Sequence, residues 1–145
     1  MLTTDQKGAI AESAIAHAAI KMHIGVYRPM FEGGRYDLIF DIGGQLLRVQ
    51  CKWAPKHGST VLVRCRSCRR TRDGIRHRGY TSAEVDMIAA YCPDLDCCYL
   101  VSADRFDGRM ELMLRIAPSR NNQRAGINWA EDFTFEARLG ALLGP

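Results

Sequence analysis

The chain has 145 residues, of which 47% are hydrophobic, and a formal net charge of +4. This length allows one domain with a substantial core and excludes two domains of ordinary size. Charged and polar residues interrupt the apolar segment 10–26, which excludes a signal peptide and a membrane span. We therefore expect a cytoplasmic protein with no membrane partner.

The first predicted element is a long alanine-rich helix over residues 4–22. Thr3 and Gln6 have the spacing of a capping box, in which each side chain bonds to the backbone of the other residue. Gly8 interrupts the helix, and because glycine disfavours helices we expect another backbone to approach it closely. Glu12 has small, mostly apolar neighbours one turn away, which places a carboxylate on a face suited to packing.

Residues 36–53 are predicted to form a β-hairpin. Gly43 and Gly44 suit its two-residue turn, and this turn sets a register in which Asp37 faces Gln50. One face of the hairpin is almost wholly apolar, so we expect it to pack under a helix. That face carries Tyr36, Leu38, Phe40, Ile42, Leu47, Val49, Cys51 and Trp53.

The later predicted elements are a strand at 59–65, a helix at 82–91, and two strands at 97–102 and 110–116. The helix would open with a second capping box, Thr81 with Glu84, and the last two strands would form a hairpin that turns at Asp107 and Gly108. A polar loop and an apolar tail follow. This order of elements predicts an α/β fold.

Basic charge is concentrated in residues 64–79. They hold seven arginines and one aspartate, a local +6, while the other residues carry 13 basic and 15 acidic side chains. Such a cluster repels itself unless a polyanion is near, so it is typical of a protein that binds a phosphate backbone. A solvated, partly disordered loop is the alternative.

Six cysteines invite a metal or disulfide interpretation. Cys65 with Cys68, and Cys92 with Cys97, have spacings that a zinc site could use. Arginines surround the first pair, however, and no histidine completes a known zinc pattern. We expect buried thiols in the core rather than structural zinc or disulfides.

Three polar side chains of the predicted hairpin should converge. The Cβ atoms of Asp37 and Gln50 would lie about 5 Å apart, with Lys52 on the diagonal at roughly 7–8 Å. Carboxylate and amide oxygens suit Mg²⁺, and a lysine can hold or deprotonate a water or stabilise charge on a phosphorane. Asp41 would lie about 13 Å along the strand, too far to share an ion with Asp37. The constellation is typical of a hydrolase.

Helical Glu12, Asp37 and the Gln50-x-Lys52 pair resemble the PD-(D/E)XK nuclease superfamily, which includes restriction enzymes and Holliday junction resolvases. Together with segments 80–93 and 121–132, the glutamine form resembles the bacterial group I intron homing endonuclease branch, over roughly residues 6–133. This resemblance implies an α/β restriction-endonuclease-like core, in which helices flank a central mixed β-sheet in the order α-β-β-β-α-β. It implies a single nuclease domain over residues 1–145.

The resemblance also implies roles for these residues. Asp37 would bind Mg²⁺ directly, Glu12 directly or through water, and the Cys51 carbonyl would add a ligand, with Mn²⁺ as a substitute metal. Gln50 would complete the site or orient the attacking water, and Lys52 would position the nucleophile and stabilise the pentacovalent phosphate. Gln50 replaces an acidic residue of the family, so we expect weaker or single-metal binding.

Two segments are candidates for contact with double-stranded DNA. The arginines of segment 64–79 could enter the major groove, with Arg64 and Arg66 on one strand face, or could only hold phosphates. The loop from about residue 117 could pair its amides with adenine edges, or bond its own backbone. The predicted DNA-binding residues are Arg64, Arg66, Arg69, Arg70, Arg72, Arg76, Arg78, Arg120, Asn121, Asn122 and Gln123.

A double-strand break needs two active sites, so we expect an oligomer, and the resemblance suggests a homodimer or homotetramer. The tail 135–145 could take part or could cover its own core. The leading hypothesis is a site-specific DNA endonuclease of homing type. A junction resolvase or restriction-like nuclease is the nearest alternative, and a catalytically silent DNA-binding module is the alternative from another class.

Overall fold

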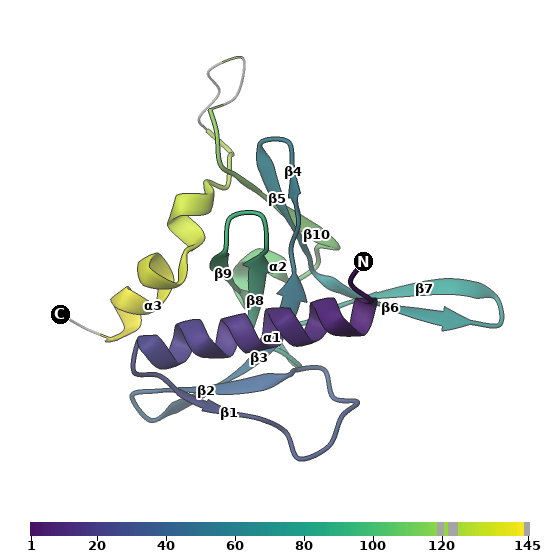
Figure 1. Ribbon diagram of the computed structural model, residues 1–145, viewed down its shortest axis with the longest axis horizontal. Helices are drawn as coiled ribbons and strands as arrows, with labels where there is room; N and C mark the ends of the chain where they lie inside the picture. Colours follow the sequence, from purple (N-terminus) through teal and green to yellow (C-terminus); the bar gives the residue numbers. More distant parts are fainter. Residues whose placement is uncertain (119–120, 122–124, 144–145) are drawn as a thin grey trace.

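The computed structural model describes residues 1–118, 121 and 125–143, and its centre is a five-stranded sheet crossed by one long helix (Figure 1). The elements are α1 (Thr4–Lys21), β1 (Gly25–Tyr27), β2 (Leu38–Ile42), β3 (Gln45–Trp53), β4 (Lys56–His57), β5 (Thr60–Arg64), β6 (Arg66–Thr71), β7 (Gly74–Gly79), β8 (Met87–Cys92), β9 (Cys97–Ser102), α2 (Ala103–Phe106), β10 (Glu111–Arg115), η1 (Ala130–Phe133) and α3 (Phe135–Leu143). Among the described residues, no helix has both the length and the apolar character needed to cross a membrane.

Helix α1 begins with the predicted capping box. The Thr3 N–H donates to Gln6 Oε1 at 2.9 Å, and the Gln6 N–H donates to Thr3 Oγ1 at 3.1 Å. The helix ends at Lys21, one residue earlier than predicted. The expectation for Gly8 is wrong, because a Cβ added there would meet no atom within 4 Å.

The central sheet has the strand order β1-β2-β3-β8-β9, and β3 pairs in parallel with β8 while the other pairs are antiparallel. The β2–β3 register runs from Leu38 opposite Val49 to Ile42 opposite Gln45, as the Gly-Gly turn predicted. The α/β class with a central mixed sheet is therefore confirmed.

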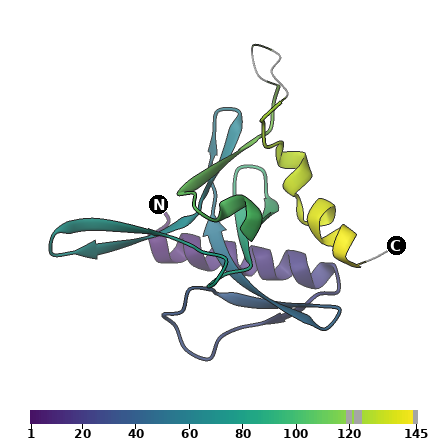
Figure 2. The same ribbon diagram turned by 180° about the vertical axis from the view of Figure 1, so that it is seen from behind.

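Apolar side chains cover both faces of this sheet. On one face, Ile15 and Ala19 of α1 pack with Phe40 and Val49, and Phe135 of α3 joins the same cluster. Figure 2 shows the opposite side, where the strands of a smaller sheet, β10-β5-β4, lie on the face of the central sheet away from α1. Buried residues from this second sheet and from β8 form the other core cluster. The central strands are therefore covered on both faces.

This double burial overturns the helix predicted at 82–91, because residues Met87–Cys92 form strand β8. Ile88 and Ala90 belong to the cluster under the second sheet, whereas Ala89 belongs to the cluster under α1. A strand buried on both faces is a continuous apolar run without polar alternation, so its sequence resembles a buried helix. The predicted order of elements is wrong at this second helix.

The hairpin predicted between 97–102 and 110–116 is also wrong. Strand β9 pairs with β8, the short helix α2 follows it, and β10 pairs with β5 in the second sheet. The strand predicted at 59–65 forms as β5, but it pairs with β10 and β4. Leu112 and Leu114 of β10 are buried against the central sheet, which explains their apolar spacing.

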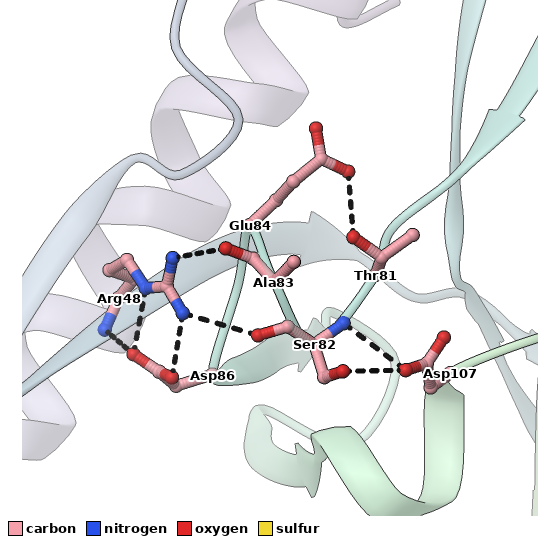
Figure 3. A network of polar contacts seen from close by, with 7 residues as sticks. All are labelled: Arg48, Thr81, Ser82, Ala83, Glu84, Asp86 and Asp107. Atoms are coloured by element: carbon pink, nitrogen blue, oxygen red, sulfur yellow. Dashed lines mark hydrogen bonds and ion pairs between the residues drawn. The ribbon is translucent and has the colours of Figure 1, made fainter.

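The turn before β8 is held by Arg48 of β3 (Figure 3). The Arg48 backbone N–H and Nε donate to Asp86 Oδ2 at 2.7 and 3.0 Å, and Nη2 donates to Oδ1 at 3.0 Å. Nη1 donates to the Ala83 carbonyl at 2.7 Å. The hydrogen bonds from Arg48 hold the pKa of Asp86 below its usual value. These contacts align the start of β8 with β3.

We expect Asp86→Asn to lower the free energy of unfolding at pH 7 by about 1–2 kcal/mol, because charged hydrogen bonds are strong but this pair remains partly in water. The pKa of Asp86 is lower in the folded than in the unfolded chain. Its contribution is therefore complete above about pH 4 and is lost as the pH falls through the folded-state pKa. Urea denaturation followed by circular dichroism at several pH values measures this difference.

The matched control is Asp73→Asn, at the exposed tip between β6 and β7. We expect it to change stability little at any pH, since exposed substitutions rarely exceed about 0.5 kcal/mol. Equal losses in the two variants at pH 7 would contradict the role given to the Arg48–Asp86 pair.

Candidate active site

Asp37 lies directly before β2 and is fixed to β3 by two hydrogen bonds. Its backbone N–H donates to the Val49 carbonyl at 2.8 Å, and its Oδ2 accepts the Cys51 backbone N–H at 2.9 Å. Burial raises the pKa of the Asp37 carboxyl, against the opposing effects of the Cys51 hydrogen bond and the nearby Lys52 and Arg28 charges. The carboxylate is thus held in place by backbone at a position where its charge is poorly hydrated.

Lys52 lies on β3, two residues beyond Gln50. Its Nζ donates to the Arg66 carbonyl at 2.9 Å and lies 5.0 Å from the centre of the Tyr80 ring. Burial lowers the pKa of Lys52, while the Asp37 charge acts in the opposite direction. The structure therefore places a partly dehydrated ammonium near the Asp37 carboxylate.

The β2–β3 ladder ends at the pair of Leu38 and Val49. Asp37 comes just before Leu38 and Gln50 just after Val49, so the two residues lie at the same end of the ladder. Its Nε2 donates to the Cys51 carbonyl at 3.2 Å. This bond engages the carbonyl that the sequence resemblance assigned to the metal. The Gln50 amide and the Cys51 carbonyl therefore interact with each other beside the two charged groups.

Glu12 reaches the site from α1. It forms an ion pair with Arg28, with 2.8 Å between Oε1 and Nη2. Glu12, Arg28 and Asp37 all line one cavity of about 330 Å³. The structure thus brings Glu12, Asp37, Gln50 and Lys52 into one region, with the two carboxylates on a shared cavity and Lys52 on the neighbouring strand.

The donor set of this cavity suits a hard divalent cation. Carboxylate oxygens are the ligands that Mg²⁺ prefers, and Mg²⁺ commonly binds through one or two carboxylates while water and substrate oxygens complete its shell. Glu12 and Asp37 supply two carboxylates, and Glu32 of the β1–β2 loop is a third on the same cavity. The described residues contain no cluster of three or more histidines, cysteines, aspartates or glutamates that could hold a metal. All six cysteines have free thiols.

Sequence reasoning missed Arg35, which joins the site to the arginine-rich segment. Its Nη1 donates to Ser67 Oγ at 2.9 Å, and its Nη2 donates to the Gly79 carbonyl at 2.7 Å. The guanidinium carbon lies 4.3 Å from the centre of the Tyr80 ring, the same ring that Lys52 approaches. These partners are 32 to 45 residues away along the chain, so no local pattern could reveal them.

The arginine-rich segment forms an antiparallel ribbon of β6 and β7 instead of a loop, although most of its side chains are solvent-exposed, as the alternative expected. We call residues 66–79 the arginine hairpin. Arg69 and Arg76 are directly opposite each other, and like charges in that arrangement repel. Arg64 belongs to β5 and Arg66 to β6, with buried Cys65 between the strands, so they do not share a strand face as predicted.

Two of the seven arginines are engaged in ion pairs. Arg78 pairs with Glu84 at 2.7 Å and Arg66 with Glu111 at 3.7 Å. The remaining five form no ion pair within the part of the chain that the structure describes, and they are Arg64, Arg69, Arg70, Arg72 and Arg76. The ribbon thus presents unpaired positive charge to solvent.

The C-terminal candidates are only partly described. Arg120, Asn122 and Gln123 lie outside the described residues, whereas Asn121 lies in a turn. The tail helix α3 covers the chain's own core, since the Phe135 and Phe40 rings pack edge to face with centroids 6.3 Å apart.

Comparisons with known proteins agree with this geometry. A family model described as PD-(D/E)XK endonuclease matches residues 2–136. A solved structure of a bacterial homing endonuclease, I-Ssp6803I, is similar with a TM-score of 0.76 and 28% identity, covering 97% of each chain. No curated protein matched. The structural match supports the restriction-endonuclease-like core expected from the sequence.

We expect Arg35→Met to loosen the arginine hairpin while leaving the rest of the fold intact. The methionine keeps an apolar chain over Tyr80 but removes the hydrogen bonds to Ser67 and Gly79. Trypsin should cut within residues 66–79 about 5- to 30-fold faster, the effect of losing about 1–2 kcal/mol of local stability. Mass spectrometry of the fragments measures the rate, and circular dichroism checks the fold.

Arg28→Met is the matched control, because it makes the same substitution in the same loop. Arg28 pairs with Glu12 rather than with the hairpin. If both variants accelerate hairpin cleavage equally, Arg35 has no special role in anchoring it.

Proposed function

Because this chain belongs to the PD-(D/E)XK endonuclease family, we propose that it is a site-specific DNA endonuclease of homing type that hydrolyses phosphodiester bonds with Mg²⁺. The observation that carries this proposal is the placement of Glu12 and Asp37 on one cavity, with the half-buried ammonium of Lys52 near Asp37. The 28% identity to a bacterial homing endonuclease over 97% of the chain supports the homing type.

Asp37 and Glu12 would hold the cation, with the Cys51 carbonyl as a further ligand once Gln50 releases it. Bound Mg²⁺, or Mn²⁺ in its place, supplies Lewis acidity at the phosphate and lowers the pKa of water. Asp37 remains anchored by the Cys51 N–H, so its carboxylate needs little reorganisation.

Lys52 acts on the phosphate and on the attacking water. One of its three N–H donors is used by the Arg66 carbonyl, which fixes the direction of the side chain. The other two can donate to a water and to a phosphate oxygen whose negative charge grows in the transition state. Partial dehydration strengthens both interactions, because a low local dielectric screens charge poorly.

Gln50 gives this site one negative charge fewer than an aspartate or glutamate would. In the structure the Gln50 amide donates a hydrogen bond to the Cys51 carbonyl, and the Arg28 ion pair neutralises the charge of Glu12. Both features weaken the attraction for a divalent cation before DNA is bound. A phosphate oxygen would supply the missing negative charge when substrate arrives.

The arginine hairpin would bind the DNA next to this site. A two-stranded ribbon fits the major groove, where arginine pairs with guanine and also reaches phosphates. Repulsion between Arg69 and Arg76 is relieved when a polyanion lies between them. Lys52 contacts the first residue of the hairpin, so DNA held by the ribbon lies close to the cavity.

A double-strand break requires two copies of the cavity, because each chain supplies one Asp37 and one Lys52. We therefore propose a homodimer or homotetramer. Leu142 and Leu143 of α3 are exposed and could contribute apolar surface to such an assembly.

We expect Asp37→Asn and Lys52→Met to reduce DNA cleavage by at least about 100- to 1,000-fold, the usual effect of removing one group that stabilises transition-state charge. The control is Asp41→Asn, the same substitution four residues further along on β2, where the carboxylate accepts the Gly44 N–H in the β2–β3 turn. Purified proteins are incubated with a plasmid library of randomised inserts and with four-way junction DNA, in Mg²⁺ or EDTA, and products are sequenced.

Discrete double-strand cuts that need Mg²⁺ and the wild-type residues support the homing type. Preferential cutting of the junction would make the chain a resolvase. Salt-sensitive DNA binding without any cleavage by the wild-type protein would overturn the enzymatic proposal and leave the silent binding module.

The arginine hairpin gives a separate prediction. Arg69→Ala and Arg76→Ala should each reduce the slope of log affinity against log salt by about 1, because each removes one phosphate contact and its counterion release. Lys21→Ala is the control, since it removes one charge at the far end of α1. Fluorescence anisotropy with a duplex at several salt concentrations measures the slopes, and unchanged slopes in both hairpin variants would exclude phosphate contact there.

A further inference from the structure

Two large apolar side chains are exposed to solvent in the β1–β2 loop. Met30 is 100% exposed and Phe31 is 83% exposed. Single exposed apolar residues are common on proteins, but two adjacent ones on a protruding loop indicate a surface that another molecule covers. Pro29 restricts the backbone just before them, which limits the freedom lost when the loop binds.

This loop forms a wall of the active-site cavity. Phe31 lines the cavity together with Glu12 and Asp37, as do Arg28 and Gly33. A phosphodiester placed at the Asp37 carboxylate therefore has Phe31 beside it. The phosphate itself is polar, so the ring would meet the deoxyribose and base edge next to that phosphate.

In Figure 1 the arginine hairpin extends to the right, and the β1–β2 loop lies below its base at the lower edge of the molecule; Figure 2 shows the same arrangement from behind. Arg35, at the end of the loop, donates to Ser67 Oγ and the Gly79 carbonyl at the base of the hairpin. Asp37 follows the loop, and Lys52 contacts the Arg66 carbonyl where the hairpin begins. The catalytic residues lie where the two projections meet, so a duplex that reaches them contacts both.

We propose that residues 28–34 are a second DNA-contacting element, which packs Met30 and Phe31 against sugars and base edges beside the scissile phosphate. This proposal rests on the proposed nuclease function. The phosphate backbone separates the two grooves of a duplex. With the hairpin in the major groove on one side of the scissile phosphate, the loop faces the minor groove on the other side.

Charge favours DNA over a second protein copy as the occupant of this loop. The Arg28 side chain is 75% exposed at the start of the loop but is offset by Glu32 within it, so the positive charge of this region comes from the arginine hairpin, to whose base Arg35 joins the loop. A second copy would bring its own arginines to this region, whereas DNA brings phosphates.

An apolar wedge gives the enzyme a way to test the shape of its target. Apolar side chains in the minor groove partly unstack a base step and bend the duplex. The energy of that deformation depends on sequence, and pyrimidine–purine steps deform most easily. Met30 and Phe31 would thus add specificity at the cleavage step without hydrogen bonds to bases.

Photo-crosslinking tests which molecule the loop contacts. The photoreactive residue p-benzoylphenylalanine replaces Phe31, and in separate proteins it replaces Ile75 of the arginine hairpin or Leu46 beyond the β2–β3 turn. All three side chains are exposed. Each protein is irradiated in Ca²⁺ with a 60-bp duplex of randomised sequence, and crosslinked DNA and protein are separated by mass.

The expected result is a DNA adduct from positions 31 and 75 and none from position 46. An adduct from position 75 alone shows that the hairpin binds DNA and the loop does not. That result overturns this inference but remains consistent with the proposed function. A protein–protein adduct from position 31 assigns the loop to a second copy. If no position gives a DNA adduct, the proposed function and this inference fail together.

Affinity measurements on the same duplex give a second readout. We expect the double variant Met30→Ala, Phe31→Ala to bind about fivefold or more weakly than wild type, because it loses apolar contact with the DNA. Leu46→Ala, which also truncates an exposed apolar side chain, should bind like wild type. Sedimentation analysis checks the oligomeric state, and a change of state at unchanged DNA affinity would contradict the inference.

Discussion

The register between β2 and β3 is the constraint on which the candidate site depends. Gly43 and Gly44 have φ angles of 59° and 88°, which suit the mirror-image turn of a two-residue hairpin. Phe40 and Val49 fix the same register from inside the core. A slip of one residue would turn Gln50 and Lys52 into the apolar cluster under α1, so the core and the candidate site both depend on one pairing.

Within that register, the charges of Asp37 and Lys52 are held by backbone groups and not by each other. Oδ2 of Asp37 accepts the Cys51 N–H, and Nζ of Lys52 donates to the Arg66 carbonyl. Burial raises the pKa of Asp37 and lowers the pKa of Lys52, so the charged form of each side chain loses hydration in the folded chain. Their environment suits a third partner that carries both positive and negative charge, such as a cation with a phosphate.

Local chemistry made part of this structure predictable. The capping box of α1 and the Gly-Gly turn each depend on neighbouring residues, so the helix, the hairpin and the Asp37–Gln50 placement could be predicted. Strand β8 could not, because burial on both faces removes the polar alternation that marks a strand. The Thr81 and Glu84 pair also misled, since it forms a turn whose side chains contact at 3.0 Å instead of a helix start.

The contacts that join the site to its surroundings were invisible for a different reason. Arg35 meets Gly79, and Arg48 meets Asp86, across 44 and 38 residues of chain. Such pairs are created by the sheet topology. Strand β3 lies beside β8, and the arginine hairpin follows β5 in the stretch of chain that connects them. Sequence reasoning could place charges on elements and pair two consecutive strands, but it could not place elements distant in sequence beside each other.

The Glu12–Arg28 ion pair and the neutral Gln50 explain why a weakly charged site would suit a specific nuclease. Glu12 is paired with Arg28, and Gln50 is neutral, so the cavity attracts a divalent cation less than it would with Glu12 unpaired and a carboxylate at position 50. On the proposed function, bound DNA adds a phosphate oxygen as ligand and offers Arg28 a new partner. Cation binding and DNA binding then support each other by linkage. DNA that fails to engage the arginine hairpin would leave the site without its full ligand set, which restricts cleavage to correctly bound targets.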